Sequence, residues 1–201
     1  AVLERLRYEP ALVIVGDSGV GKSSLCRAAV IPALGKQAPP SGELHTALPS
    51  GMACALMTPG RRPLRALAAA LRALQPAGAH LGTSEDDDEA VAATLTMEPS
   101  ALVRLLHKAR GTTAGALLFV DQLEELITLA DPHEAATFAA ALSELGLGRH
   151  DLRLLCTARG DFLTRLLSLP GFAQLLPRAL FLLHPPTEAQ VREAILGPAQ
   201  R

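Results

Sequence analysis

The sequence predicts an α/β fold, a three-layer sandwich in which helices cover both faces of a parallel sheet of five strands. Five short apolar runs alternate along the chain with segments of helical periodicity, and strands separated by helices in this way usually pair in parallel. The chain has 201 residues, of which 49% are hydrophobic. This length is enough to bury one full core, so we expect a single domain over residues 1–201.

The first half of the chain supplies two of the strands. Ala11 to Val15 is apolar and rich in β-branched residues, as expected of a strand buried on both faces. A helix is predicted from Lys22 to about Leu34, and the glycines and prolines of residues 35–50 predict an irregular connection. Gly51 to Met57 is the second predicted strand. Pro63 to Leu74 follows as a helix, with leucines at helical spacing and proline in its first turn.

The second half supplies the other three strands. The acidic stretch from Glu85 to Glu89 is expected to be a solvated loop or the start of a helix, since runs of like charge usually stay in water. Asp131 and Thr187 are predicted to cap helices with their side chains. The predicted elements are helices at 99–109 and 132–145, strands at 116–120, 152–158 and 179–183, a helix from residue 161 and a last helix after residue 187.

Composition and charge narrow the function classes. The 19 Lys and Arg residues balance 20 Asp and Glu residues, which argues against a dedicated nucleic-acid binder, because such proteins usually carry a basic excess on one face. No apolar run in the sequence approaches the length of a membrane span. Cys26, Cys54 and Cys156 are far apart and lack ligand spacing, so we expect buried, reduced thiols in a cytoplasmic protein.

The segment GDSGVGKS at residues 16–23 fits the Walker A pattern in full. Its glycines let the backbone curl so that successive N–H groups point at phosphate oxygens, and the following helix adds its positive N-terminal end. Lys22 is expected to reach the β- and γ-phosphates, and the Ser23 hydroxyl to ligate magnesium. The alternative is a chance glycine-rich turn, but this segment follows an apolar strand and opens a helix. The residues expected to bind nucleotide are Gly16, Asp17, Ser18, Gly19, Val20, Gly21, Lys22, Ser23 and Ser24.

The segment LLFVDQLEEL at residues 117–126 resembles a Walker B strand. Asp121 ends this apolar run, which puts a carboxylate at the sheet edge where ligands bind, and we expect it to hold magnesium through a water molecule. Glu124 and Glu125 follow within one turn, and either is a candidate for activating the attacking water. The alternative is that both glutamates are ordinary first-turn residues stabilised by the helix dipole.

A third motif, CTARGDF at residues 156–162, ends another apolar strand. Arg159 is expected at the same sheet edge, where a cation can contact the γ-phosphate and act in catalysis. The alternative is an ordinary surface arginine. Asp161 is expected to cap the next helix rather than take part in the chemistry.

Together these motifs resemble the STAND-class NTPases (signal transduction ATPases with numerous domains), and within them the bacterial novel STAND group. The P-loop continues as SSLCRAAVIPAL, similar to the family's Ser-Ser-Leu helix with its Pro-Ala-Leu end. Leu123 stands where the family's Asp-Gln-Phe-Glu-Glu box has phenylalanine, and Asp17 where the family often has proline. The other resembling segments are TPGRRPLRALAAAL at 58–71, LLFVDQLEELITL at 117–129, LLCTARGDFL at 154–163 and AILGPA at 194–199.

The resemblance implies a P-loop NTPase whose parallel sheet is ordered 5-1-4-3-2. It also implies ATP rather than GTP, and a molecular switch in which nucleotide exchange or slow hydrolysis couples a sensor domain to an effector domain of the same chain. Assembly into a homo-oligomer on activation is part of the same expectation. Because the chain begins at Ala1 rather than Met and stops inside a predicted helix, we expect a domain cut from a longer multidomain protein.

Two other functions remain open from the residues alone. A P-loop kinase would transfer phosphate to a small molecule, but such kinases usually carry a lid rich in arginine, and residues 159–178 offer only three arginines. A scaffold that does not hydrolyse its nucleotide would use binding only to stabilise the fold. The Walker A and Walker B residues together favour an ATPase that depends on magnesium.

Overall fold

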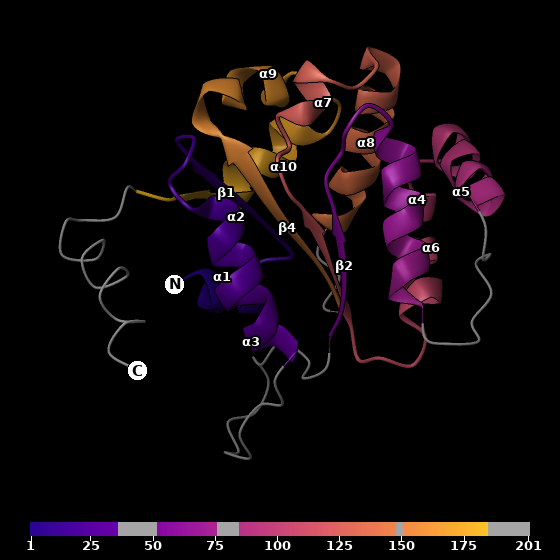
Figure 1. The fold of residues 1–201 in the computed structure, drawn as a ribbon, viewed down its shortest axis with the longest axis horizontal. Coiled ribbons are helices and arrows are strands. Elements are labelled where there is room, and N and C mark those ends of the chain that lie inside the picture. The colour runs from indigo at the N-terminus through magenta and orange to yellow at the C-terminus, as the bar shows by residue number, and fades with distance from the viewer. Residues whose placement is uncertain (36–51, 76–84, 148–150, 185–201) are drawn as a thin grey trace.

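The computed structural model describes residues 1–35, 52–75, 85–147 and 151–184 (Figure 1). Within these residues, five parallel strands form one sheet in the order β2-β3-β4-β1-β5. This is the predicted order 5-1-4-3-2 read from the opposite edge, so the α/β fold and the strand order are confirmed. The strands are β1 (Ala11–Gly16), β2 (Ala53–Met57), β3 (Ala116–Val120), β4 (Leu152–Arg159) and β5 (Leu180–Leu182).

Helices cover both faces of the sheet (Figure 1). The helices are α1 (Val2–Tyr8), α2 (Lys22–Leu25), α3 (Ile31–Gly35), α4 (Pro63–Leu74), α5 (Glu85–Met97), α6 (Ala101–Arg110), α7 (Glu125–Thr128), α8 (Pro132–Leu145), α9 (Leu163–Leu167) and α10 (Phe172–Ala179). One face carries α1 and the helical segment from α2 to α3, and the other carries α4, α6, α8 and α10, with α5 packed outside them. The short helices α7 and α9 lie in the connections after β3 and β4.

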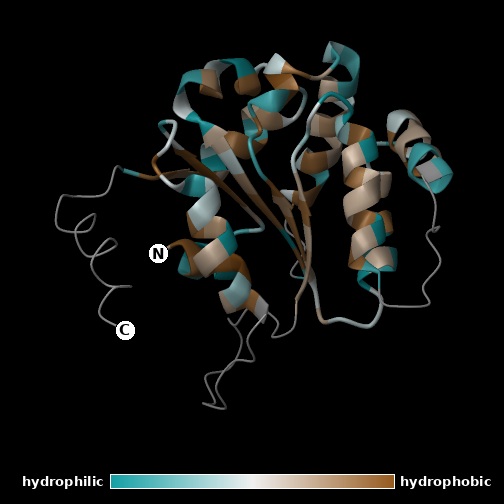
Figure 2. Cartoon of the chain, in the orientation of Figure 1, coloured by the Kyte–Doolittle hydropathy of each residue, from teal (hydrophilic) through white to brown (hydrophobic). Residues whose placement is uncertain are grey.

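Each face of the sheet has its own apolar core, as the brown strands between helices in Figure 2 indicate. Leu12 and Ile14 of β1 pack with the residues of α1 and α3, whereas Val13 and Val15 pack with those of α4, α6, α8 and α10. Every residue of β3 is buried. This two-sided burial explains why the strands are continuous apolar runs and lack the alternation of half-exposed strands.

Helix α1 precedes the first predicted element, the strand at Ala11, and is an addition to the predicted order. Its apolar residues Val2 and Leu6 lie one turn apart and are both buried in the core of their face. The guanidinium of Arg153 in β4 is itself buried and donates to the carbonyls of Leu6 and Arg7 at distances of 2.8 and 3.3 Å. A buried arginine therefore satisfies carbonyls of the last turn of α1.

The helix predicted from Lys22 to about Leu34 is helical throughout, but its middle is not an α-helix. Residues Cys26–Val30 form a π-helical segment, labelled η1, between α2 and α3. Segments of π-helix are frequent at functional sites, and this one carries Arg27, whose contacts are described below.

The acidic stretch at residues 85–89 is the start of α5, one of the two structures expected for it. It is not solvated throughout, however. The Asp88 side chain is only 5% exposed and accepts two hydrogen bonds of 2.9 Å from the Arg72 guanidinium of α4. Asp88 is buried despite the run of like charge because a bidentate arginine on the neighbouring helix compensates its carboxylate.

Two predicted caps have different outcomes. Asp131 caps α8, since its carboxylate accepts hydrogen bonds from the amides of His133 and Glu134. The prediction that Asp161 caps a helix is wrong. A turn of 3-10 helix, η2 (Gly160–Phe162), precedes α9, and neither of them has a side-chain cap; the Asp161 carboxylate is bound to the Arg159 side chain. Thr187 lies outside the described residues.

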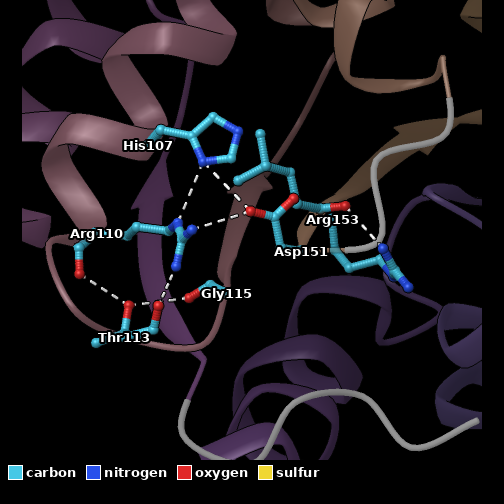
Figure 3. A network of polar contacts seen from close by, with 7 residues as sticks. His107, Arg110, Thr113, Gly115, Asp151 and Arg153 are labelled. Carbon is cyan, nitrogen blue, oxygen red and sulfur yellow. Dashed lines mark hydrogen bonds and ion pairs between the residues drawn. The ribbon is translucent and has the colours of Figure 1, made fainter. Parts of the chain in front are cut away.

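A polar network lies at the sheet edge opposite the carboxyl ends of the strands (Figure 3). Asp151, just before β4, accepts from the Arg110 guanidinium at 3.1 Å and lies 3.3 Å from His107 Nδ1. Arg110 also donates to the carbonyl of Thr113 in the turn before β3. These contacts join α6 to the entrances of two strands, which is a structural role. Among the helices described, none is both long and apolar enough to cross a membrane.

Candidate nucleotide-binding site

The predicted motifs meet at one edge of the sheet. The P-loop follows β1, Asp121 follows β3, and Arg159 ends β4, which lies between these two strands. Because the strands are parallel, their carboxyl ends are all at this edge. The motifs enclose a cavity of about 330 Å³. Its walls are Ser18, Gly19, Gly21, Lys22, Ser23, Ser24, Gln122, Glu124, Thr157 and Arg159.

The P-loop has the backbone that its glycines allow. Gly19 and Gly21 have φ angles of 80° and 93°, a region that residues with a Cβ rarely adopt. Lys22 is almost completely buried, with 9% of its surface exposed, and its Nζ donates to the carbonyls of Gly16 and Asp17 at 2.8 and 2.7 Å. The ammonium group is therefore held inside the curl of the loop, beside the cavity.

Asp121 is the centre of a compact group of hydrogen bonds. Its Oδ1 accepts from the hydroxyls of Ser23 and Thr157, each at 2.6 Å. Its Oδ2 accepts from the Arg27 guanidinium at 3.1 and 3.3 Å. The carboxylate is 7% exposed, so these donors replace most of the water that an ionised aspartate needs.

The donors also decide the charge of Asp121. Burial on its own would raise the pKa of this carboxyl, but the hydrogen bonds and the positive charge of Arg27 outweigh burial and hold the pKa below its usual value. Asp121 is therefore a carboxylate at neutral pH, with both oxygens fixed in direction beside Ser23.

Gln122, the residue after Asp121, is the one described non-glycine residue with a positive φ, at 59°. Such a conformation is unfavourable for a residue with a Cβ by about 1–2 kcal/mol. Its surroundings hold it there, because its amide donates to the Thr157 hydroxyl at 2.9 Å and the next amide, of Leu123, donates to the Thr157 carbonyl at 2.9 Å. The strained turn directs the chain after Asp121 past the cavity.

The two glutamates that follow are placed differently. Glu124 lies on the cavity wall, and its Oε2 accepts from the amide of Arg159 at 3.2 Å. The Oε2 of Glu125 instead accepts from the amide of Gly60, in the loop after β2, at 2.8 Å. The structure therefore brings Glu124 together with the P-loop and directs Glu125 toward the neighbouring loop.

Arg159 lies on the cavity wall as predicted. Its guanidinium forms a two-pronged ion pair with Asp161, with distances of 3.0 and 2.6 Å. It also lies over the ring of Phe162, 5.4 Å from the ring centre. Of the predicted nucleotide-binding residues, Gly16, Asp17 and Val20 complete the loop behind the cavity wall.

Sequence reasoning missed Arg27, Thr157 and Gln122. Arg27 is four residues after Ser23, on the same side of the helix, where it reaches Asp121 and lies 5.7 Å from the centre of the Phe119 ring. Thr157 is a hydroxyl side chain near the carboxyl end of the buried strand β4, in register one position beyond the Val120–Cys156 pair. A polar residue near the end of a buried strand is the signal in the sequence that could have indicated Thr157 and its contact with Asp121.

Replacing Thr157 with valine is expected to lower the free energy of unfolding by about 1–3 kcal/mol, because the change removes one of the two hydroxyl donors to Asp121 Oδ1 and leaves the Gln122 amide without its partner. Thr137→Val is the matched control, since the hydroxyl of this buried threonine only donates to the carbonyl of His133 within α8. Denaturant unfolding measures both. Equal stabilities of the two variants would contradict the supporting role of Thr157.

Solved structures with the same fold support the architecture. The chain is 14% identical to the Walker-type ATPase PABY2304 of Pyrococcus abyssi, with a TM-score of 0.58 over 99% of this chain and 56% of that one. It is 14% identical to the Aeropyrum pernix ORC1 protein in complex with DNA, with a TM-score of 0.54 over 94% of this chain and 43% of that one. The ADP form of the Aeropyrum pernix ORC2 protein is 13% identical, with a TM-score of 0.53 over 98% of this chain and 49% of that one.

The chain thus spans about half the length of these structures. Comparison with curated proteins gave no match. The family model described as Novel STAND NTPase 1 matches residues 1–201. With the P-loop, the Walker B aspartate and the strand order already placed, this match over the whole sequence identifies the chain as a member of the novel STAND NTPase 1 family.

Proposed function

We propose that this chain is an ATP-binding, magnesium-dependent ATPase domain that hydrolyses ATP slowly and acts as a regulatory switch in a longer multidomain protein. The observation that carries the proposal is the cavity at the carboxyl ends of the strands, in which Lys22, Ser23 and Glu124 meet. A P-loop kinase would usually carry a lid rich in arginine, and residues 159–178 offer only three arginines.

The triphosphate would bind in the curl of the P-loop. The amides of Gly19 to Ser24 and the positive end of the helix supply donors for phosphate oxygens. The Lys22 ammonium, now on two loop carbonyls, would exchange these neutral acceptors for the β- and γ-phosphates, which bind a cation more strongly.

The residues around Ser23 fit a magnesium ion. The Ser23 hydroxyl uses its hydrogen on Asp121, so the lone pairs of Oγ stay free for a cation, and Asp121 is ionised close by. Oxygen ligands of this kind are those that magnesium prefers, with its remaining positions filled by water and phosphate. When bound, the ion would neutralise charge on the phosphates and so promote attack on the γ-phosphorus.

Glu124 is the residue that we propose activates water. Its carboxylate lies on the cavity wall and would accept the proton of a water molecule that attacks the γ-phosphorus, while the bond from that phosphorus to the β–γ bridging oxygen breaks. Its Oε2 also accepts from the Arg159 amide, which holds the carboxylate in place beside the cavity.

The proposed switching function would require the other domains of the longer protein. Membership of the STAND family supports a nucleotide-dependent signalling role with sensor and effector domains in the same chain, oligomerisation on activation and a cytoplasmic location. Cys26 and Cys156 are buried as expected, whereas Cys54 is only partly buried. Burial raises the pKa of Cys26 to about 12, which keeps it from reacting as a thiolate.

The test is nucleotide-dependent thermal stabilisation, measured with ATP, GTP and ADP with and without magnesium and followed by a phosphate-release assay. Binding at a hundredfold excess over Kd should add about 2.7 kcal/mol to the stability of the domain. We expect the largest shift with ATP and magnesium, and slow release of phosphate. Stabilisation by none of the nucleotides would refute the proposal, and binding without phosphate release would favour the non-hydrolysing scaffold.

A further inference from the structure

The ion pair between Arg159 and Asp161 lies at the mouth of the proposed phosphate site. The two residues are separated only by Gly160, and both guanidinium arms reach the carboxylate, at 3.0 and 2.6 Å. Arg159 is at the same time part of the cavity wall. A cation that can contact a γ-phosphate is therefore already bound to an anion of its own chain.

Asp161 is also within the electrostatic range of the P-loop. The pKa of its carboxyl is lowered chiefly by the hydrogen bond from Arg159, and the positive charge of Lys22 adds to this effect. A carboxylate that is close enough to be stabilised by the charge of Lys22 is also close enough to be repelled by a phosphate bound to Lys22. The charge of Asp161 is therefore unfavourable for a bound triphosphate whenever Arg159 does not compensate it.

The ion pair can open, so that Arg159 can take another anion as its partner. The Arg159 and Asp161 side chains are 41% and 56% exposed, and an exposed ion pair contributes little stability, so it exchanges readily. The Phe162 ring beneath the guanidinium, 5.4 Å away, gives Arg159 a surface on which to turn without losing its cation–π contact. A doubly charged phosphate oxygen group would be a stronger partner than a solvated carboxylate.

We propose that Asp161 is a specificity-determining residue that competes with the γ-phosphate for Arg159 and so lowers the affinity for ATP relative to ADP. ADP has no group at the γ position and leaves the ion pair intact. ATP takes Arg159 and leaves Asp161 as an unpaired negative charge beside the triphosphate. This inference rests on the proposed function, because it requires that nucleotide phosphates occupy the cavity.

The test compares the Kd values of a non-hydrolysable ATP analogue and of ADP, each with magnesium, by calorimetry. Asp161→Asn removes the competing charge, so the affinity for the ATP analogue should rise about two- to fivefold, the range set by an exposed ion pair. The affinity for ADP should not change. Asp161→Glu, which restores the charge, should return the ratio of the two Kd values toward that of the wild type.

Two further variants separate competition from a structural role. Glu89→Gln breaks a comparably exposed pair, Arg62–Glu89, in which the side chains are 52% and 56% exposed, and it should leave the Kd ratio unchanged. In the Arg159→Ala background, Asp161→Asn should favour the ATP analogue over ADP by less than in the wild-type background, because only the direct repulsion between Asp161 and the triphosphate is left to remove. A variant that only disturbed the η2 turn would weaken both nucleotides together.

The outcomes separate this inference from the proposed function. If Asp161→Asn leaves the Kd ratio unchanged, or shifts both nucleotides equally, the competition by Asp161 is overturned while wild-type binding still supports the ATPase. If the wild-type chain binds neither nucleotide, the proposed function fails, and this inference fails with it. A rise in ATP affinity that Asp161→Glu reverses would establish it.

Discussion

Replacing Lys22 with alanine is expected to abolish nucleotide binding at ordinary ligand concentrations. Lys22 is buried in the P-loop curl, where its ammonium would contact two phosphates. Hydrogen bonds to charged groups contribute about 1.5–3 kcal/mol each, so the loss of two should weaken the affinity roughly 100-fold or more. Calorimetric titration of wild type and variant with ATP and magnesium measures this directly.

The matched control is Lys108→Ala, which removes an exposed lysine of α6 outside the cavity. It should leave the Kd unchanged. The unfolding temperature without nucleotide shows whether the Lys22 variant still folds. Unaltered affinity in a folded Lys22→Ala protein would rule out the assigned role of the P-loop lysine.

Glu124→Gln is expected to slow ATP hydrolysis by roughly 100-fold or more while nucleotide binding persists. A general base typically contributes a factor of about 10²–10⁴, and an amide cannot take the proton of the attacking water. The glutamine carbonyl can still accept from the Arg159 amide, so the loop should keep its place. Single-turnover phosphate release, with Kd measured in parallel, separates the chemical step from binding.

Glu125→Gln provides a closely matched control, since it makes the same change one residue along the chain. The side-chain carbonyl of the glutamine can still accept from the backbone amide of Gly60, and we expect turnover close to that of the wild type. The reverse result, with slow turnover in Glu125→Gln and normal turnover in Glu124→Gln, would transfer the role to Glu125. Normal rates of hydrolysis in both variants would show that neither Glu124 nor Glu125 activates the attacking water.

The sequence alone determined the fold class and the general position of the site. Apolar runs such as Ala116–Val120 predict strands because only burial on both faces favours so many adjacent apolar side chains. The P-loop and Asp121 each follow such a strand, and parallel strands bring their carboxyl ends to one edge. The strand order came from the family resemblance, and the structure confirms it.

The sequence could not predict contacts between side chains that are distant along the chain. Glu124 accepts from the Arg159 amide and Glu125 from the Gly60 amide. These partners depend on the paths of two other loops. The burial of Asp88 depends on Arg72 of a neighbouring helix.

Only the tertiary structure decided how the carboxylates of the site are held. Arg27 reaches Asp121 across 94 positions of sequence, and the cap predicted for Asp161 is replaced by its bond to Arg159. Local patterns report what a residue prefers with its near neighbours, such as a strand, a turn or a cap. The partner of a charged side chain is set by which oppositely charged group the folded chain brings within hydrogen-bond distance, and local patterns carry no information on that distance.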